Sequence, residues 1–444
     1  MRRLGLLALP LAGALVLGGA PAVAEPIVPG PGVPLARSGT LVDAGFNSFY
    51  ESGPSVVAVD TAGTRIVASQ DGRIQERRAG GSWSAPRALP GAGTIADLQV
   101  ASGRPGTALA AYVRTSGYGK PRALLAQVRG PSRTWSAPYA LTKPASGARF
   151  DVQVLSNEDG DHAVVWARSD LSRPQLHTSI RLRGDRWRTT SLGPLVGGFT
   201  AAMDASGAVY VAREYGPGND PTSVVRRVKR PGRAPGAAVV LPTRGSRYWT
   251  YLVERTGRQT LVVNDHERPA RVLRQETLGG PLVTVWSEPY AWVRAAVGGG
   301  RLRLVRQRWT ESGTSAAWTQ VVRPRPGPAV ALGEVYVARP FMDAHGRGVI
   351  LSGRDDRVEP GQPLDDIDTV WARSFTDSGM RAPFRVAGEP AGYPEEGLGI
   401  WWDGWNATDG HQLLVTYSPH ANQPEQEGGG MPYETQLWST QVKR

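Results

Sequence analysis

One short motif recurs along the whole chain: an acidic or amide residue, two variable residues, a glycine, and then an apolar run. Clear copies begin at Asp60, Asn157, Asp204, Glu254 and Asp343, and weaker copies surround Gly106, Gly300 and Gly410. Asp or Asn at the start of a turn can bond the backbone two residues on, and glycine supplies the left-handed residue that closes a tight hairpin. The eight copies lie about 50 residues apart on average, which is the spacing of propeller or solenoid repeats.

A second landmark repeats in the same register. Trp83-Ser84-Ala85-Pro86 and Trp135-Ser136-Ala137-Pro138 lie 52 residues apart, and Trp286-Ser287-Glu288-Pro289 is a looser copy. Trp187 and Trp318 hold similar places in their units. An aromatic residue followed by a proline that suits an edge strand predicts an outer strand packed on the neighbouring unit.

Four short strands fit into each repeat, and four strands make one blade of a β-propeller. The sequence therefore predicts an all-β fold over residues 36–444: a propeller of eight four-stranded blades, with seven as the alternative count. The last unit stops before a full outer strand, whereas a spare strand-like stretch, Arg37–Val42, precedes the first unit. We expect this N-terminal strand to complete the last blade and close the ring, which removes open sheet edges.

The N-terminal residues predict export. Arg2 and Arg3 precede an apolar run from Leu4 to Leu17, and Ala22-Val23-Ala24 fits a signal-peptidase site, so residues 1–24 form a signal peptide. Residues 25–35 are rich in proline and glycine, which predicts an extended tether. The apolar run from Leu4 to Leu17 is too short to span a membrane comfortably. We expect a monomer without membrane insertion, either extracellular or associated with the cell wall.

The chain is basic, with 51 Lys and Arg against 39 Asp and Glu and a formal net charge of +12. A positive field of this size favours polyanions such as wall polymers. The densest basic run is Arg226–Arg233, for which solvated strand faces and a polyanion site are the two interpretations. The chain has no cysteine, which excludes thiol catalysis and cysteine-ligated metal sites.

These repeats resemble those of secreted actinobacterial β-propellers, a group loosely similar to the sialidase superfamily. The resemblance implies the propeller fold over most of the chain. Sialidase Asp-boxes, Ser-x-Asp-x-Gly-x-x-Trp, have no match here, and Asn157–Trp166 comes nearest with the wrong spacing. The motif that carries the first arginine of the sialidase triad is also missing, with Arg339-Pro340 as a faint echo. Both departures argue against sialidase activity.

Acidic residues gather in one stretch, which contains Asp355, Asp356, Glu359, Asp365, Asp366 and Asp368. A solvated loop, a Ca²⁺ site and a catalytic carboxylate pair are the three interpretations, because Ca²⁺ prefers oxygen ligands and glycosidases need two carboxylates. The spacing does not match an EF-hand loop, and the six histidines show no metal-binding spacing. We therefore expect no cofactor and no metal site, with Ca²⁺ as the alternative.

The last unit contains Ile400-Trp401-Trp402-Asp403-Gly404-Trp405. Strand alternation places Trp401 and Trp405 on one face. Aromatic faces suit sugar rings, and Asp403 can accept hydrogen bonds from sugar hydroxyls, whereas the alternative for tryptophan on a blade is packing between blades. Trp401, Asp403 and Trp405 are our predicted ligand-binding residues.

A regular repeat without a recognisable catalytic set predicts a non-catalytic binding or scaffolding propeller that contacts a glycan or a cell-surface protein. The alternative is a glycoside hydrolase or lyase whose carboxylates come from separate blades and meet only in the folded ring.

Overall fold

The computed structural model describes residues 33–34, 56–60, 62–68, 73–78, 81–82, 84–85, 87–115, 120–168, 170–172, 174–215, 223–243, 246, 248–265, 267–309, 315–323, 325–335, 337–342, 346, 348–354, 369–376, 379–388, 398–401, 406–408, 412–421 and 438–443. Strands are the regular elements of this part of the chain. It contains no helix with the length and hydrophobicity needed to cross a membrane.

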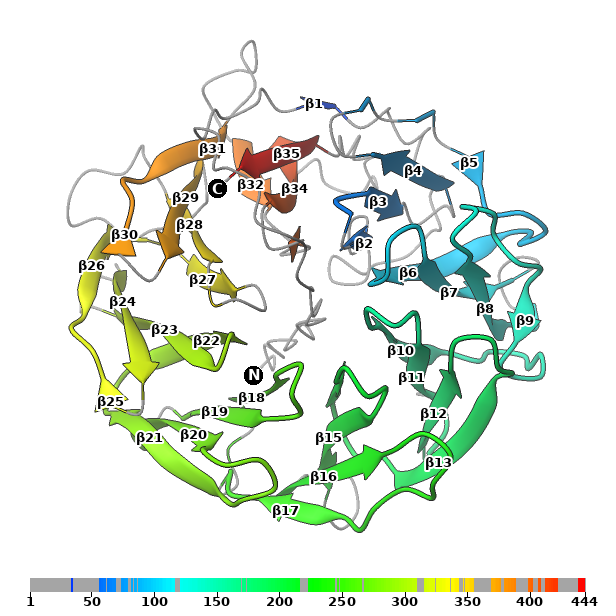
Figure 1. Cartoon of the computed structure of the whole chain (residues 1–444), viewed down its shortest axis with the longest axis horizontal. Coiled ribbons are helices and arrows are strands. Elements are labelled where there is room, and N and C mark those ends of the chain that lie inside the picture. The colour runs from blue at the N-terminus through cyan, green and yellow to red at the C-terminus, as the bar shows by residue number, and fades with distance from the viewer. Residues whose placement is uncertain are drawn as a thin grey trace, which may run out of the picture.

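The described strands form eight antiparallel sheets arranged around a ring (Figure 1). We number the sheets as blades in chain order. The first four blades are blade 1, with β2 (Val56–Val59), β3 (Arg65–Ala68), β4 (Arg73–Arg77) and β5 (Arg87–Ala88); blade 2, with β6 (Ile95–Ser102), β7 (Ala108–Arg114), β8 (Ala123–Arg129) and β9 (Tyr139–Ala140); blade 3, with β10 (Phe150–Ser156), β11 (His162–Arg168), β12 (Gln175–Arg181) and β13 (Arg188–Pro194); and blade 4, with β14 (Phe199–Met203), β15 (Val209–Tyr215), β16 (Ser223–Lys229) and β17 (Val239–Leu241).

The remaining blades follow the same plan. They are blade 5, with β18 (Tyr248–Val253), β19 (Gln259–Asn264), β20 (Ala270–Gln275) and β21 (Leu282–Glu288); blade 6, with β22 (Trp292–Gly298), β23 (Arg301–Trp309), β24 (Ser315–Arg323), β25 (Arg325–Pro326) and β26 (Val330–Glu334); blade 7, with β27 (Val337–Met342), β28 (Gly348–Arg354), β29 (Thr369–Thr376), β30 (Gly379–Met380) and β31 (Phe384–Gly388); and blade 8, with β32 (Leu398–Trp401), β33 (Asn406–Thr408), β34 (Gln412–Ala421), β35 (Trp438–Lys443) and β1 (Val33–Pro34). The predicted all-β propeller with eight blades is confirmed.

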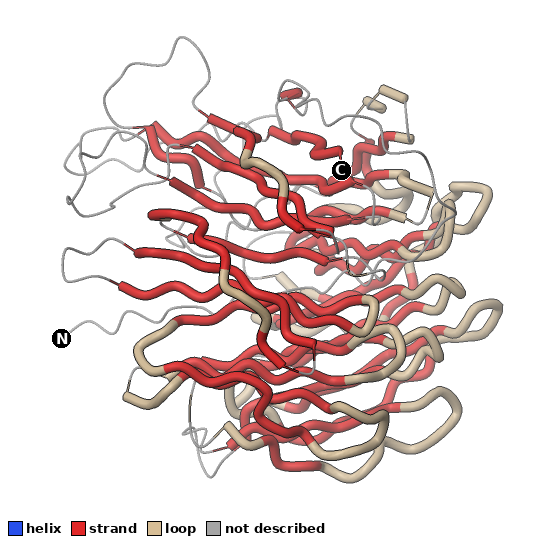
Figure 2. The backbone as a smooth tube through the Cα atoms, turned by 60° about the vertical axis from the view of Figure 1, so that its left-hand side comes forward, coloured by secondary structure: helices blue, strands red, loops and turns tan. Residues whose placement is uncertain are grey.

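Within blades 1 to 7 the chain runs outward, from the strand nearest the centre of the ring toward the strands at its rim (Figure 1). Because consecutive strands are antiparallel, the turns after the first and third strands of a blade lie on one side of the ring. Figure 2 shows the strands from the side, with most of the described loops projecting in one direction.

The two ends of the chain meet in blade 8. Val33 pairs with Ser439 and Pro34 with Trp438, so β1 is the rim strand of this sheet. An N-terminal strand therefore closes the ring, as the sequence predicts. The described pairing strand is Val33–Pro34, near the end of the segment predicted as a tether, and the predicted closing strand, Arg37–Val42, lies outside the described residues. A proline is tolerated here because β1 is an edge strand.

The repeated motif forms the turn between the first and second strands of the blades. Gly63, Gly160, Gly207 and Gly257 have φ between 73° and 85°, in the left-handed region that favours glycine. Asp60 Oδ1 accepts hydrogen bonds from the N–H groups of Ala62 and Thr64 at 2.9 and 2.8 Å. Asn157 and Asp204 repeat this pattern. The predicted turn chemistry is confirmed at these copies, and Asp409-Gly410 lies outside the described residues.

The hydrophobic core is divided into clusters that lie between neighbouring blades. One cluster joins blades 1 and 2 through residues such as Ile66, Ile74, Tyr112 and Leu125. Further clusters join blades 2 and 3, 3 and 4, 4 and 5, 5 and 6, and 6 and 7. Blades 2 to 6 therefore bury both of their faces among the described residues, and the seams between blades are the places where a polar side chain most affects stability.

Candidate functional site

The residues that the sequence suggests for ligand binding fall mostly outside the described part. Trp401 lies in β32, where its backbone pairs with Ser418. Asp403 and Trp405 lie outside the described residues, as does the acidic stretch 355–368. Their proposed roles stay predictions. Among the described residues, no group of three His, Asp or Glu side chains is placed to hold a metal ion.

The Asp and Asn residues of the turn motif connect neighbouring blades. Asp60 Oδ2 in blade 1 accepts a hydrogen bond of 2.8 Å from the N–H of Gly106 in blade 2. Asn157 Nδ2 in blade 3 donates to the carbonyl groups of Asp204 and Ala205 in blade 4. The recurring turn therefore also stabilises the contact between blades, because the buried Asp60 and Asn157 side chains form hydrogen bonds across a seam.

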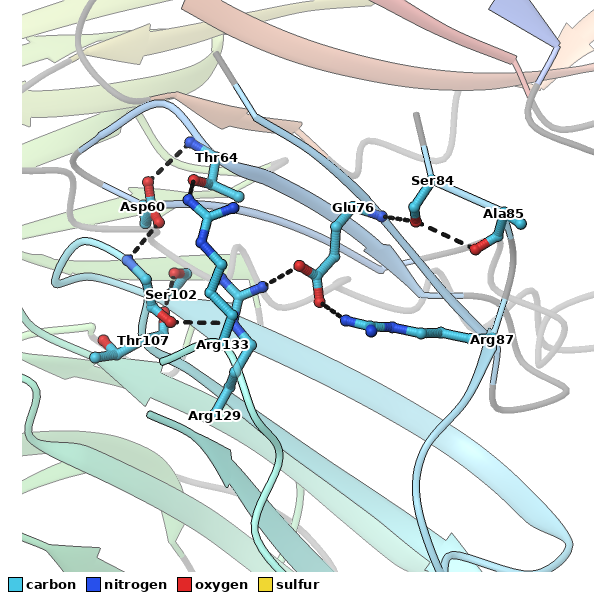
Figure 3. A network of polar contacts seen from close by, with 11 residues as sticks. Asp60, Thr64, Glu76, Ser84, Ala85, Arg87, Ser102, Thr107, Arg129 and Arg133 are labelled. Atoms are coloured by element: carbon cyan, nitrogen blue, oxygen red, sulfur yellow. Dashed lines mark hydrogen bonds and ion pairs between the residues drawn. The ribbon is translucent and has the colours of Figure 1, made fainter. Parts of the chain in front are cut away.

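A buried ion pair reinforces the same seam between blades 1 and 2 (Figure 3). Arg129, whose side chain is fully buried, forms a salt bridge with Glu76, and Glu76 also bonds Arg87 at 2.7 Å. Arg129 Nε donates to the carbonyl of Gly106 at 3.1 Å. Burial lowers the pKa of Arg129, and the nearby Glu76 carboxylate opposes this effect. This network fixes blade 2 on blade 1.

The Trp-Ser-Ala-Pro landmark also proves structural. Ser136 N donates to Val128 O at 2.8 Å, and Ser136 Oγ accepts from Val128 N at 3.1 Å, so the serine extends the sheet where the following proline cannot donate. Ser84 makes the same pair of bonds with Glu76 (Figure 3). Trp135 is buried in the cluster between blades 1 and 2. The predicted packing of this tryptophan on the neighbouring unit is confirmed.

Amide side chains of one blade clamp the innermost strand of the next blade, a feature that the sequence analysis did not predict. Gln153 Nε2 donates to Phe199 O at 3.0 Å, and its Oε1 accepts from Ala201 N at 2.7 Å. Asn264 makes the equivalent two bonds with the N–H and carbonyl of Val293. Each clamp satisfies backbone groups on the side of the inner strand where the blade has no further strand. An isolated Gln or Asn on a strand carries too little signal to reveal this role.

His162 is the buried titratable side chain of blade 3. Its Nδ1 lies 2.8 Å from Ser156 Oγ at the two ends of the Asn157 turn. Burial, together with a smaller effect of the positive charge of Arg181, lowers the pKa of His162 to about 3. The imidazole is therefore neutral at ordinary pH and has a packing role rather than that of an accessible base.

A basic residue closes the turn after the third strand in several blades. Arg77 Nε donates to Gly81 O at 2.6 Å and Arg181 Nε to Asp185 O at 3.2 Å. Lys229 Nζ donates in the same way to the carbonyl of Arg233. The available signal was the basic residue that ends the third strand in each of blades 1 to 4: Arg77, Arg129, Arg181 and Lys229. These side chains cap the turn, and the other arginines of the turn are left to face solvent.

The basic run Arg226–Arg233 is divided by strand alternation. Arg226 bonds Gln259 in blade 5, whereas Arg227 and Lys229 face blade 3. Arg230 and Arg233 lie in the turn and are exposed. Arg230 and Arg233 are therefore solvated, although they lie in a turn and not on a strand face. Arg226 is instead bonded to the neighbouring blade.

The exposed arginines of two neighbouring turns form the candidate site. In blade 3, residues 182–187 carry Arg183 and Arg186, and in blade 4, residues 230–238 carry Arg230 and Arg233, all exposed. We call these four residues the blade 3–4 basic surface. The one acidic side chain in these turns, Asp185, forms a salt bridge with Arg188. Arg188 also contributes to the positive charge that lowers the pKa of buried Lys229 in the adjoining blade.

Comparisons with known proteins support the fold alone. No family model and no curated protein sequence matches the chain. Among solved structures it is similar to a prolyl endopeptidase, with a TM-score of 0.50 and 11% identity over 85% of this chain and 56% of that one. It also matches the β-propeller domain of the trilobed protease from Pyrococcus furiosus, with a TM-score of 0.46, 8% identity, and coverage of 79% of this chain and 94% of that one.

The acylaminoacyl peptidase of Pyrococcus horikoshii matches with a TM-score of 0.44 and 8% identity, over 85% of this chain and 59% of that one. The chain thus spans little more than half the length of the two peptidases. The similarity agrees with a propeller repeat protein and carries no activity across.

Proposed function

We propose that the protein is an extracellular, non-catalytic binding propeller that holds an acidic glycan, such as a cell-wall polyanion, on the blade 3–4 basic surface. The observation that carries this proposal is the clustering of Arg183, Arg186, Arg230 and Arg233 on two adjacent turns whose one acidic side chain is already paired. The formal net charge of +12 acts in the same direction, because it attracts a polyanion from a distance.

The chemistry of arginine suits this ligand class. A guanidinium group presents a planar fork of N–H donors that matches a carboxylate or sulfate group in two parallel bonds. Exposed turns on a rigid ring hold such groups at fixed spacing, which favours a repeating polymer over a single small anion. Trp401, Asp403 and Trp405 stay our proposed contacts for sugar rings in blade 8.

The test is binding of the mature chain to an array of neutral and acidic glycans at low and high salt. We expect selective retention of acidic glycans that weakens with salt, since exposed charges are screened. The variant R183Q/R186Q/R230Q/R233Q should lose about tenfold or more in affinity, because four of the attracting charges are gone. The matched control R78Q/R114Q/R149Q/R381Q removes the same charge from exposed positions elsewhere and should retain most of the binding.

Three results would overturn the proposal. The first is an array without retained acidic glycans, and the second is equal loss in both quadruple variants, which would reduce the effect to net charge. The third is release of cleaved product, which would favour the glycoside hydrolase or lyase alternative. A W405A variant tests the proposed sugar contact in blade 8 separately. Unchanged glycan binding in this variant would show that Trp405 does not contact the ligand.

A further inference from the structure

Two arginines occupy the same position in different blades. Arg213 lies six residues after the turn glycine Gly207 in blade 4, and Arg306 lies six residues after Gly300 in blade 6. Each sits on the second strand of its blade, opposite a third-strand residue, Val225 or Trp318. Because the strand register from the turn is the same, both guanidinium groups are directed to the seam with the preceding blade.

In blade 6 this arginine has a counter-ion. Glu288, the last residue of β21 in blade 5, forms salt bridges with Arg306 and with Arg308. The Glu288 side chain is buried and Arg306 is mostly buried in this seam, whereas Arg308 is half-exposed at its edge. A buried charge needs such a partner, because an unpaired ion in the interior is costly.

Blade 3 offers no carboxylate at the corresponding place. Glu288 lies opposite Ala270, the first residue of the third strand in blade 5. The residue in that register in blade 3 is Gly193, opposite Leu176, which faces blade 4 as Ala270 faces blade 6. Arg213 is only 3% exposed, and its Nε and Nη1 atoms are buried without a hydrogen-bond partner.

The nearest acidic residue along the chain does not take this role. Glu214 follows Arg213 on the same strand, so its side chain is directed to the opposite face of the sheet. Its carboxylate accepts a hydrogen bond of 3.1 Å from the N–H of Gly198. Burial and, to a smaller extent, the positive charge of Arg227 lower the pKa of Arg213 to about 10. Tyr215 has the opposite effect on this pKa.

Gly193 keeps this place open. Its φ of 100° is unfavourable for residues with a side chain, and a Cβ there would come within 3.0 Å of Arg213 Nη2. The guanidinium group therefore lies against bare backbone at the end of β13. Gly193 is five residues from Arg188, about 17 Å along a strand, which puts this place at the far end of the seam from the blade 3–4 basic surface.

A second guanidinium group lies in the same seam. Arg227 is half-buried on β16, on the same face of the blade as Arg213, and its Nε is also buried without a partner. Thr178, which alternates onto the facing side of blade 3, carries a buried hydroxyl without a partner as well. Several donors without acceptors in one seam are the complement of an anion.

We propose that Arg213 and Arg227 bind a carboxylate group of a ligand, which takes the place that Glu288 fills in the seam between blades 5 and 6. This site goes beyond the proposed function and does not depend on it. The ligand class is a small carboxylate or the uronate residue of a larger glycan. The two sources share the same recognition chemistry, a planar carboxylate between two guanidinium groups.

The test measures the melting temperature of the full chain and the heat of titration with sodium acetate, sodium glucuronate and glucose. A ligand that binds the folded state raises the melting temperature in proportion to its occupancy. We expect glucuronate to do so and glucose not to. A response to acetate as well assigns the site to small carboxylates, whereas a response to glucuronate alone assigns it to a uronate.

Two variants keep the result specific. R213M removes the buried charge with little change in shape, so it should fold and lose the response. R227Q removes the second guanidinium group and should reduce the ligand response at least about tenfold. R78Q removes the same charge from an exposed position in blade 1 and should behave as the wild type.

The absence of a carboxylate response in the wild type would overturn the proposal. An equal response in the wild type, R227Q and R213M would do so too, because the anion would then bind elsewhere. Acidic-glycan binding that survives in R213M would leave the proposed function standing on the blade 3–4 basic surface.

Discussion

Asp60 in blade 1 and Gly106 in blade 2 are joined by a hydrogen bond of 2.8 Å from the Gly106 N–H to Asp60 Oδ2. The same aspartate closes its own turn through Oδ1, so a single buried side chain links local structure to the contact between blades. The sequence alone predicts only the first of these two roles, the closing of the turn.

We therefore expect D60A to lower the free energy of unfolding by about 2–4 kcal/mol, because three backbone N–H groups lose their acceptor. D60N should lose roughly half as much, since the amide oxygen still closes the turn while its NH₂ group cannot accept from Gly106. Denaturation by urea gives both values. An equal loss in the two variants would mean that the contact across the seam has no separate weight.

The Arg129–Glu76 pair should be more costly to break than to remove. E76Q leaves the fully buried guanidinium without a counter-ion and should cost about 3–5 kcal/mol. R129M/E76Q removes both charges and should be less destabilised than E76Q. Chemical denaturation of the wild type, E76Q, R129M and R129M/E76Q completes a double-mutant cycle. If the losses in free energy of unfolding of the two single variants simply add in the double variant, the two charges are not coupled.

Acid should destabilise the protein through His162. Its folded-state pKa of about 3 lies below the ordinary value, so the unfolded state binds the proton more readily between these two values. Stability from this group is present above the ordinary pKa of about 6.5 and is lost as the pH falls toward the folded value. Melting temperatures from neutral pH to pH 4 should fall more steeply in the wild type than in H162Q.

His177 provides the control for that measurement. It is half-buried and stacks on Trp166 at 4.3 Å between ring centroids, and burial lowers its pKa as well. H177Q should therefore change the pH profile less than H162Q. Identical profiles for the wild type and H162Q would show that another group causes the acid sensitivity.

The amide clamp of Gln153 is a further target. Q153L keeps the shape but leaves the N–H of Ala201 and the carbonyl of Phe199 without their partner, which should cost about 2–3 kcal/mol. Q99L removes one bond, to the carbonyl of Val152, and should cost less. Hydrogen exchange at the Ala201 amide should accelerate in Q153L and stay unchanged in Q99L.

The sequence alone predicts the scaffold because its signals are local. A turn that needs a carboxylate at its first position and a left-handed residue at its fourth leaves the pattern of Asp60 and Gly63, and repetition of that pattern gives the blade count. Trp135 is predictable for the same reason, since its motif recurs. The ion pair of Arg129 is not, because its partner Glu76 lies on another blade and the two are brought together only in the folded ring.

The Arg213 site illustrates the intermediate case. Counting six residues from the turn glycines would have aligned Arg213 with Arg306, but the contrast between Gly193 and Glu288 becomes visible only when the strand register is known. The blade 3–4 basic surface likewise depends on two turns that are neighbours in space. For Asp403 and Trp405 the structure adds nothing to the prediction, because both lie outside the described residues.

The pairing of Val33 with Ser439 has a consequence for the order of assembly. Blade 8 combines strands that lie about 400 positions apart, so β1 has no partner until almost all of the chain has been synthesised. Contacts of such long sequence separation form late, because the entropy of closing the loop must be met before the contact stabilises anything. The other seven blades can fold in turn from neighbouring segments, and closing the eighth then converts an open stack of blades into a ring without a free end.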